Sequence, residues 1–332
     1  MTTYKEQIGT NIEVVSSDPS NPLAGQVWYN TTTQTLKALN VTTSGSWSSG
    51  GNLNTARSFM AGTGASNTAA LAFGGNTGSI SKLNESYNGT SFTEVNDLNT
   101  ARAALGGAGT QTSTLAFGGN LQNPTSFNLV ESWNGTNWTE TTDMNVVRSE
   151  QGSAGVDNTS ALSFGGGTPS VTALVERWNG SNWTEVADLN TARNNLAGNG
   201  TATSALAYGG GPGNGTLDNT ELWNGSSWTE VNNLNFARTG ATGAGTNNTS
   251  ALCVGGSRNP ASGTKLNNVE EWNGTNWTAV QVLPATKATG AGNGTTASAF
   301  AAGGFQTEPT RTTANYEWTG AGAPTTVTFD VT

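Results

Sequence analysis

Residues 178–210 read WNGSNWTEVADLNTARNNLAGNGTATSALAYGG, and closely similar strings begin at Tyr87, Trp133, Trp223 and Trp272. A shortened form of the same string covers residues 47–75. A unit of this length is too thin to bury its own apolar face, so tandem copies stack on one another. The recurrence therefore predicts a repeat architecture for most of the chain.

Four landmarks mark each unit. The first is a basic residue in an LNTAR-like string, at Arg57, Arg102, Arg148, Arg193, Arg238 and Lys287. The second is a glycine doublet that ends an apolar run. The third is an aromatic residue, at Tyr87, Trp133, Trp178, Trp223, Trp272 and Trp318, and the fourth is another aromatic residue five positions later in all but the last unit. Such regular spacing favours a structural role for these residues.

Each unit divides into four short strands. In the quoted copy these are NNLAGNG, SALAY, VERW and NWTEV, with VERW taken from the residues just before Asn179. The Asn-Gly pair between the last two strands is a strong hairpin signal, because both residues tolerate positive φ. Four-stranded units in tandem predict a β-propeller, with the small residues of the first strand at its crowded centre.

The landmarks also predict how the ring closes. The first three strands occur six times, whereas Trp47 belongs to a fourth strand that has no first three strands before it. The segment around Trp47 therefore completes the sixth blade, which leaves residues 325–331 to pair with a hairpin near residues 26–39. The competing arrangement uses residues 325–331 as the closing strand and leaves Trp47 outside.

The glycine doublet, the Glu-x-aromatic strand, the second Trp and the basic residue together resemble the Kelch repeat over residues 47–320. Ala replaces the Pro that usually precedes the Arg, and the two aromatic residues are closer together than in most Kelch units. The resemblance implies an all-β, six-bladed propeller. The domain organisation expected is an extended arm (1–20), a β-hairpin attachment segment (21–46), the propeller (47–323) and a C-terminal strand (324–332).

Composition argues against several function classes. The 332 residues carry a net charge of −9, contain no His, and include Cys253 as their one cysteine. Nucleic-acid binding needs clustered basic residues, and most catalytic and metal sites use His. We therefore expect no enzyme activity, no cofactor, no metal and no nucleic-acid partner. No apolar run is long enough for a membrane span, and the N-terminus lacks the apolar core of a secretory signal.

The candidate binding residues lie where the units differ. The loops between the second and third strands vary in length, and they carry Phe127, Arg258, Lys265, Phe305 and Arg311. Exposed Phe and Arg side chains on one rim are typical of a recognition surface, although longer solvated loops would look the same. The six landmark basic residues could instead form a central anion site, but their repetition in every unit favours a structural Arg–Glu pair.

Residues 19–37, PSNPLAGQVWYNTTTQTLK, together with the near-identical repeats, resemble structural proteins of marine tailed phages. This resemblance implies a virion component of the tail-fibre or decoration type. Residues 1–46 would bind other virion proteins, and the propeller would present a face to a host glycan or receptor protein; a homo-oligomer is compatible with both. The alternatives are a cytoplasmic Kelch interaction module and, ranked last, a glycan-active enzyme.

Overall fold

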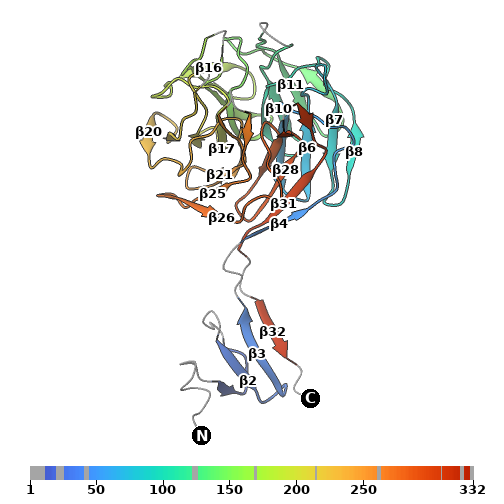
Figure 1. The fold of residues 1–332 in the computed structure, drawn as a ribbon, viewed down its shortest axis with the longest axis vertical. Coiled ribbons are helices and arrows are strands. Elements are labelled where there is room, and N and C mark those ends of the chain that lie inside the picture. The colour runs from blue at the N-terminus through green and yellow to red at the C-terminus, as the bar shows by residue number, and fades with distance from the viewer. Residues whose placement is uncertain are drawn as a thin grey trace. The chain divides into compact units, whose positions relative to one another are not determined.

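The computed structural model describes residues 12–19, 26–40, 45–121, 126–167, 170–213, 215–259, 263–307, 309–321 and 325–329. Contacts divide the chain into two units. One comprises Met1–Ser46 with Gly320–Thr332, and the other Trp47–Thr319. The larger unit is built from four-stranded antiparallel sheets (Figure 1), so the predicted all-β propeller is confirmed.

Six four-stranded sheets, here called blades 1 to 6, make up the larger unit. Blade 1 contains β5 (Ala61–Ser66), β6 (Ala69–Phe73), β7 (Asn84–Tyr87) and β8 (Phe92–Val95), and blade 2 contains β9 (Gly106–Gly109), β10 (Thr114–Phe117), β11 (Val130–Trp133) and β12 (Trp138–Glu140). Blade 3 contains β13 (Gly152–Asp157), β14 (Ser160–Phe164), β15 (Val175–Trp178) and β16 (Trp183–Val186), and blade 4 contains β17 (Ala197–Thr201), β18 (Ser204–Tyr208), β19 (Thr220–Trp223) and β20 (Trp228–Val231). Blade 5 contains β21 (Thr242–Asn247), β22 (Ser250–Val254), β25 (Val269–Trp272) and β26 (Trp277–Val280), and blade 6 contains β27 (Ala291–Gly294), β28 (Ser298–Ala302), β31 (Asn315–Thr319) and β4 (Ser46–Ser49).

Strand β4, which carries Trp47, occupies the outermost position of blade 6 next to β31. The Trp47 ring lies 5.3 Å from that of Trp318, and the amide of Gly50 donates to the carbonyl of Asn315 at 3.0 Å. The blade therefore combines strands from both ends of the larger unit.

Hydrogen bonds between blades 6 and 1 repeat those between the other neighbours. In each blade the amide of the second doublet glycine donates to the carbonyl of the landmark basic residue in the next blade, and the Gly304 amide donates to Arg57 in the same way at 2.7 Å. The side-chain amide of Asn67 also donates to the carbonyl of Trp318, at 3.1 Å. The blades therefore form a closed circle.

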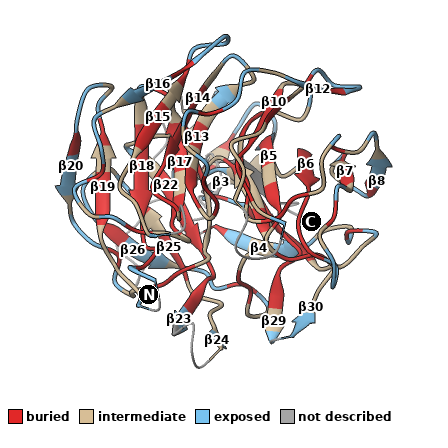
Figure 2. Cartoon of the chain, turned by 90° about the horizontal axis from the view of Figure 1, so that it is seen from above, coloured by how far each residue is buried: buried red, intermediate tan, exposed pale blue. Residues whose placement is uncertain are grey.

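The core lies between the blades, as the burial colours of Figure 2 show. The described residues form six apolar clusters, each shared by two neighbouring blades. The cluster between blades 6 and 1 contains Leu53, Tyr87 and Phe300. Because each blade buries its faces only against its neighbours, stability depends on the closed circle.

The landmark Trp residues of the third strands have a structural role. They are at most 2% exposed, and their indole N–H groups donate to carbonyls in the turn between the first two strands of the same blade. These residues are Trp133, Trp178, Trp223, Trp272 and Trp318.

The Trp residues of the fourth strands differ in how their indole N–H groups are satisfied. Trp277 donates to the hydroxyl of Thr220 in blade 4 at 3.0 Å. At the position of Thr220, blade 3 has Val175, and the buried N–H of Trp228 in blade 4 has no partner in the structure. The hydrogen bond from Trp277 to Thr220 therefore belongs to the junction of blades 4 and 5, and the equivalent bond is missing for Trp228 at the junction of blades 3 and 4.

We expect Thr220→Val to lower the free energy of unfolding by about 1 kcal/mol, because it leaves the buried N–H of Trp277 without an acceptor. The measurement is equilibrium unfolding in urea followed by Trp fluorescence. A variant as stable as the wild type would show that this hydrogen bond makes no net contribution.

The smaller unit is a four-stranded sheet made from both ends of the chain. Its order is β1 (Glu13–Val15), β2 (Val27–Asn30), β3 (Thr35–Asn40) and β32 (Thr325–Phe329). Strands β2 and β3 form the expected hairpin, and β32 pairs antiparallel with β3. Residues 1–20 were expected to be an extended arm. Within the described residues 12–19, however, β1 pairs in parallel with β2, and Asp18 accepts hydrogen bonds from Trp28 and Asn30.

Candidate functional site

A ring of six residues surrounds the propeller axis, two positions after each landmark basic residue. This axial ring consists of Phe59, Ala104, Glu150, Asn195, Gly240 and Thr289. All six have φ between 50° and 60°. The amide of each donates to the carbonyl of the preceding member at 2.7 or 2.8 Å, and Phe59 donates to Thr289 to complete the circle.

The left-handed conformation costs an ordinary residue about 1–2 kcal/mol. It persists in five non-glycine residues because it directs each amide and carbonyl along the circle, where both are satisfied. The backbone is thus the same in every blade, whereas the side chains differ. The axial ring therefore presents six different residues on a backbone that is equivalent in all six blades.

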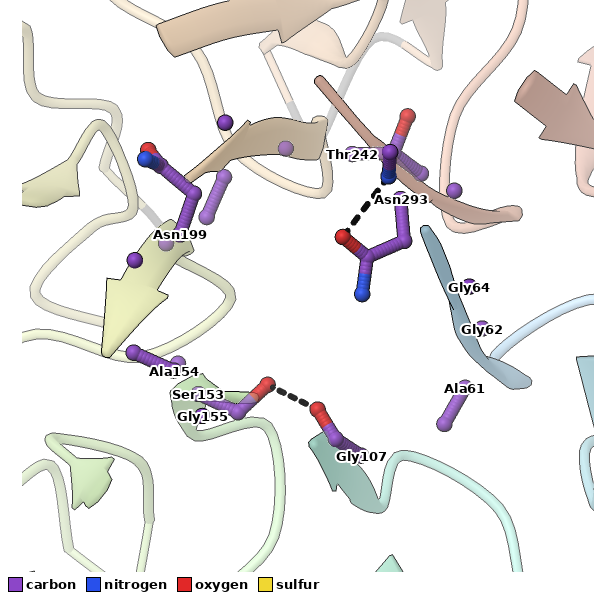
Figure 3. Close-up of a pocket in the computed structure, with 18 of the residues that line it drawn as sticks. Ala61, Gly62, Gly64, Gly107, Ser153, Ala154, Gly155, Asn199, Thr242 and Asn293 are labelled. Atoms are coloured by element: carbon purple, nitrogen blue, oxygen red, sulfur yellow. Dashed lines mark hydrogen bonds between the residues drawn. The ribbon is translucent and has the colours of Figure 1, made fainter. Parts of the chain in front are cut away.

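Two cavities lie along the axis. The larger, of about 340 Å³, is lined mainly by the first strand of every blade, and Figure 3 shows it. Its lining includes no charged side chain among the described residues. Asn293 extends into it, and the Ser153 hydroxyl donates to the carbonyl of Gly107 in the neighbouring blade at 2.9 Å. This cavity offers amide, hydroxyl and backbone groups, which suit water or a neutral polar ligand.

The smaller cavity, of about 90 Å³, is lined by the axial ring and by the residues that follow it. We call it the axial pocket. Glu150 is the one ionisable side chain among its lining residues. Burial raises the pKa of Glu150, although Asn195 and Asn194 donate hydrogen bonds to its carboxylate and oppose that shift.

The structure brings together three of the five predicted rim residues. The hairpin of β23 (Ser257–Asn259) and β24 (Thr264–Lys265) in blade 5 lies beside the hairpin of β29 (Phe305–Thr307) and β30 (Thr310–Arg311) in blade 6 (Figure 2). The Lys265 ammonium lies 5.7 Å from the centre of the Phe305 ring, and the Arg311 guanidinium lies 5.3 Å from it. Arg311 also donates to the Ser58 hydroxyl and to the side-chain oxygen of Asn76 in blade 1.

Phe305 corrects one expectation. It was predicted to be exposed, but it is only 6% exposed. Its ring meets that of Phe59 edge-on at 5.9 Å, across the junction of blades 6 and 1. Phe305 therefore supports the two basic side chains and does not itself present a recognition surface.

The other two predicted rim residues lie apart from Phe305. Arg258 is exposed, and its guanidinium lies 5.7 Å from the centre of the Phe236 ring. Phe127 is half-buried in blade 2, where its carbonyl accepts a hydrogen bond from the amide of Arg148. Phe127 is therefore not part of the group around Phe305.

The landmark arginines are structural in each of the first five blades. Their side chains are fully buried, and each forms an ion pair with a Glu on the third strand of the same blade, at 2.6–3.1 Å in blades 1 to 4. The pairs are Arg57–Glu85, Arg102–Glu131, Arg148–Glu176, Arg193–Glu221 and Arg238–Glu270. None of these arginines lines either cavity, so they form no central anion site.

Lys287 is the exception in blade 6. Tyr316 occupies the position that Glu has in the other blades, and the Lys287 ammonium lies 5.1 Å from the centre of its ring. The ammonium donates to the carbonyls of Gly303 and Ala314, both at 2.8 Å, and burial lowers the pKa of Lys287 to about 7. The repeat pattern predicts the same role for Lys287 as for the landmark arginines. In the structure, however, Lys287 lacks the Glu partner that each of those arginines has.

The axial pocket was not among the sites predicted from the sequence. Its signal is visible in retrospect, because the residue two positions after the landmark is different in every unit. Among the described residues no group of three His, Cys, Asp or Glu side chains could hold a metal ion, and no helix is long and apolar enough to cross a bilayer.

The fold is similar to that of a solved protein titled "Structure of YjhT". The two align with a TM-score of 0.66 and 12% identity, over 80% of this chain and 96% of that one. No family model matches the sequence, and no curated protein does. At this identity the likeness extends to the fold alone.

Proposed function

We propose that this chain is a non-enzymatic virion structural protein of a tailed phage. Its Kelch-like propeller would present a binding face to anionic groups on the host surface, of a glycan or of a protein. The observation that carries the proposal is the gathering of Arg258, Lys265 and Arg311 on two adjacent hairpins of blades 5 and 6.

Charge distribution supports this choice of ligand. The chain has 13 Lys and Arg residues and a net charge of −9. Six of the 13 are buried landmarks, and only Lys82, Arg177, Arg258, Lys265 and Arg311 remain in residues 47–319. Three of these five share one rim, where two of them flank Phe305. Guanidinium groups suit carboxylates and sulfates because they donate paired hydrogen bonds.

The smaller unit supports an attachment role for residues 1–46. Its sheet is held by strands from both ends of the chain, and Val14 of β1 is 70% exposed. An exposed apolar side chain on an edge strand suits pairing with another protein. Mass spectrometry of purified virions tests the assignment, and absence of the protein from the particles would overturn it.

We expect the Arg258→Ala/Arg311→Ala variant to bind anionic polysaccharides at least tenfold more weakly than the wild type. The probes are immobilised alginate and carrageenan, with neutral dextran as the reference ligand. The matched variant Lys82→Ala/Arg177→Ala removes the same charge elsewhere in the propeller and should bind like the wild type. Equal loss in both variants would indicate general charge attraction, and hydrolysis of a polysaccharide would favour the enzyme alternative.

A further inference from the structure

Among the described residues, the axial pocket is lined by one carboxylate, Glu150, and by no basic side chain. The Glu150 carboxylate accepts a hydrogen bond from the side-chain amide of Asn194 at 2.7 Å. Within the described residues no basic side chain forms an ion pair with Glu150. Its charge is therefore held at the axis without a counter-charge from the rest of the described chain.

One lining residue, Gln151, carries a second acceptor that points to the same kind of ligand. Gln151 lines the pocket and is 7% exposed; its Nε2 donates to the carbonyl of Phe117 at 2.9 Å, but its Oε1 has no partner. Buried acceptors of this kind are normally satisfied. A ligand that carries several donors and no acceptor would complement the Glu150 carboxylate and the Gln151 oxygen.

Part of the wall is apolar, although the polar ring members Asn195 and Thr289 also line it. Met60, Leu105 and Leu196 line the pocket, and the aromatic ring residue Phe59 lines it too. One water molecule needs roughly 10–15 Å³ of such a cavity, so the 90 Å³ present here admits a ligand of several heavy atoms. A polar end beside Glu150 and an aliphatic stem against the apolar wall would fill it.

We propose that the axial pocket binds the primary ammonium group of a lysine side chain on a partner protein. An ammonium group has three donors and no acceptor, and the methylene stem of lysine packs well on apolar surface. A divalent metal suits the pocket less, because it prefers several carboxylate ligands and Glu150 is the one carboxylate in the lining. The proposal is independent of the basic rim described above.

The test uses the full-length chain and ligand-observed NMR. The probes are a lysine tripeptide with blocked termini, its Nε-acetylated form, n-butylammonium and n-butanol. We expect the unmodified tripeptide and n-butylammonium to bind, and the two neutral probes to bind at least tenfold more weakly. Equal binding of charged and neutral probes would overturn the proposal.

Two variants locate the site. Glu150→Gln keeps the shape of the side chain and should weaken binding of the charged probes at least tenfold, whereas Glu185→Gln removes an exposed carboxylate of blade 3 and should leave binding unchanged. Ala104→Asn places a larger side chain in the axial ring, where Asn tolerates a φ of 53°, and should block binding without a change of charge. Unchanged binding in both Glu150→Gln and Ala104→Asn would refute this location.

Discussion

Replacing Arg102 with Met is expected to lower the free energy of unfolding by about 3–5 kcal/mol, because it leaves a buried charge without its partner. The Arg102 side chain is fully buried and donates to Glu131 at 2.8 Å and to the carbonyl of Leu129 at 2.6 Å. Glu131 is itself only 1% exposed, so water cannot replace the guanidinium. Urea unfolding at pH 7, followed by Trp fluorescence, measures the loss.

A second variant separates the charge from the packing. In Arg102→Met/Glu131→Gln the acceptor for the amide of Asn99 remains, but the buried negative charge is gone. We expect the double variant to regain part of the stability lost in Arg102→Met. A loss of less than 1 kcal/mol in Arg102→Met would show that the repeated Arg–Glu pair does not hold the blade.

The second large effect is a pH dependence that arises from Lys287. Burial lowers its pKa to about 7 from an ordinary value of 10.5, so the folded protein favours the neutral amine. Below pH 7 the folded state bears the full cost of this burial. That cost decreases as the pH rises from about 7 towards 10.5, by at most about 1.4 kcal/mol per pH unit. We therefore expect the wild type to gain on the order of 2 kcal/mol of stability between pH 7.5 and 9.5.

The variant Lys287→Met should lose this dependence and be the more stable protein at pH 7.5. Urea midpoints at pH 7.5, 8.5 and 9.5 measure both curves, and Lys82→Met, which removes an exposed lysine, is the control. Tyr87 does not interfere, because burial and its hydrogen bond to Glu317 raise its pKa to about 12. Parallel curves for the wild type and Lys287→Met would contradict the assignment to Lys287.

Most of the fold can be predicted from the sequence, because its signals act within one unit. The Asn-Gly turns, the apolar second strand and the spacing of Trp47 from Arg57 each concern residues that are close in the chain. The place of β4 beside β31 also followed from counting strands. The structural role of the arginines could also be predicted, because a residue that is repeated in almost every unit is expected to make the same contacts in each blade.

The candidate site was harder to predict from the sequence than the fold. Arg311 and Lys265 were identified as departures from the repeat, but the burial of Phe305 depends on Phe59, which is far away in the chain and adjacent only after closure. Glu150 was not predicted as a site residue because its position, between the landmark Arg148 and the first strand of the blade, resembles an ordinary loop in the sequence. Its left-handed backbone and its place at the axis exist only when all the blades are present.

The sequence alone thus determined that the chain is all-β, that it repeats one four-stranded unit, and which residues of the unit are structural. Local turn preferences and alternating apolar residues suffice for this, since they act over a few residues. The tertiary structure alone decided which side chains of unlike units meet: Phe59 with Phe305 at the junction of blades 6 and 1, and Glu150 with Asn194 at the axis. Those contacts arise because closing the circle brings together positions that lie in different units, and a pattern confined to one unit carries no information about them.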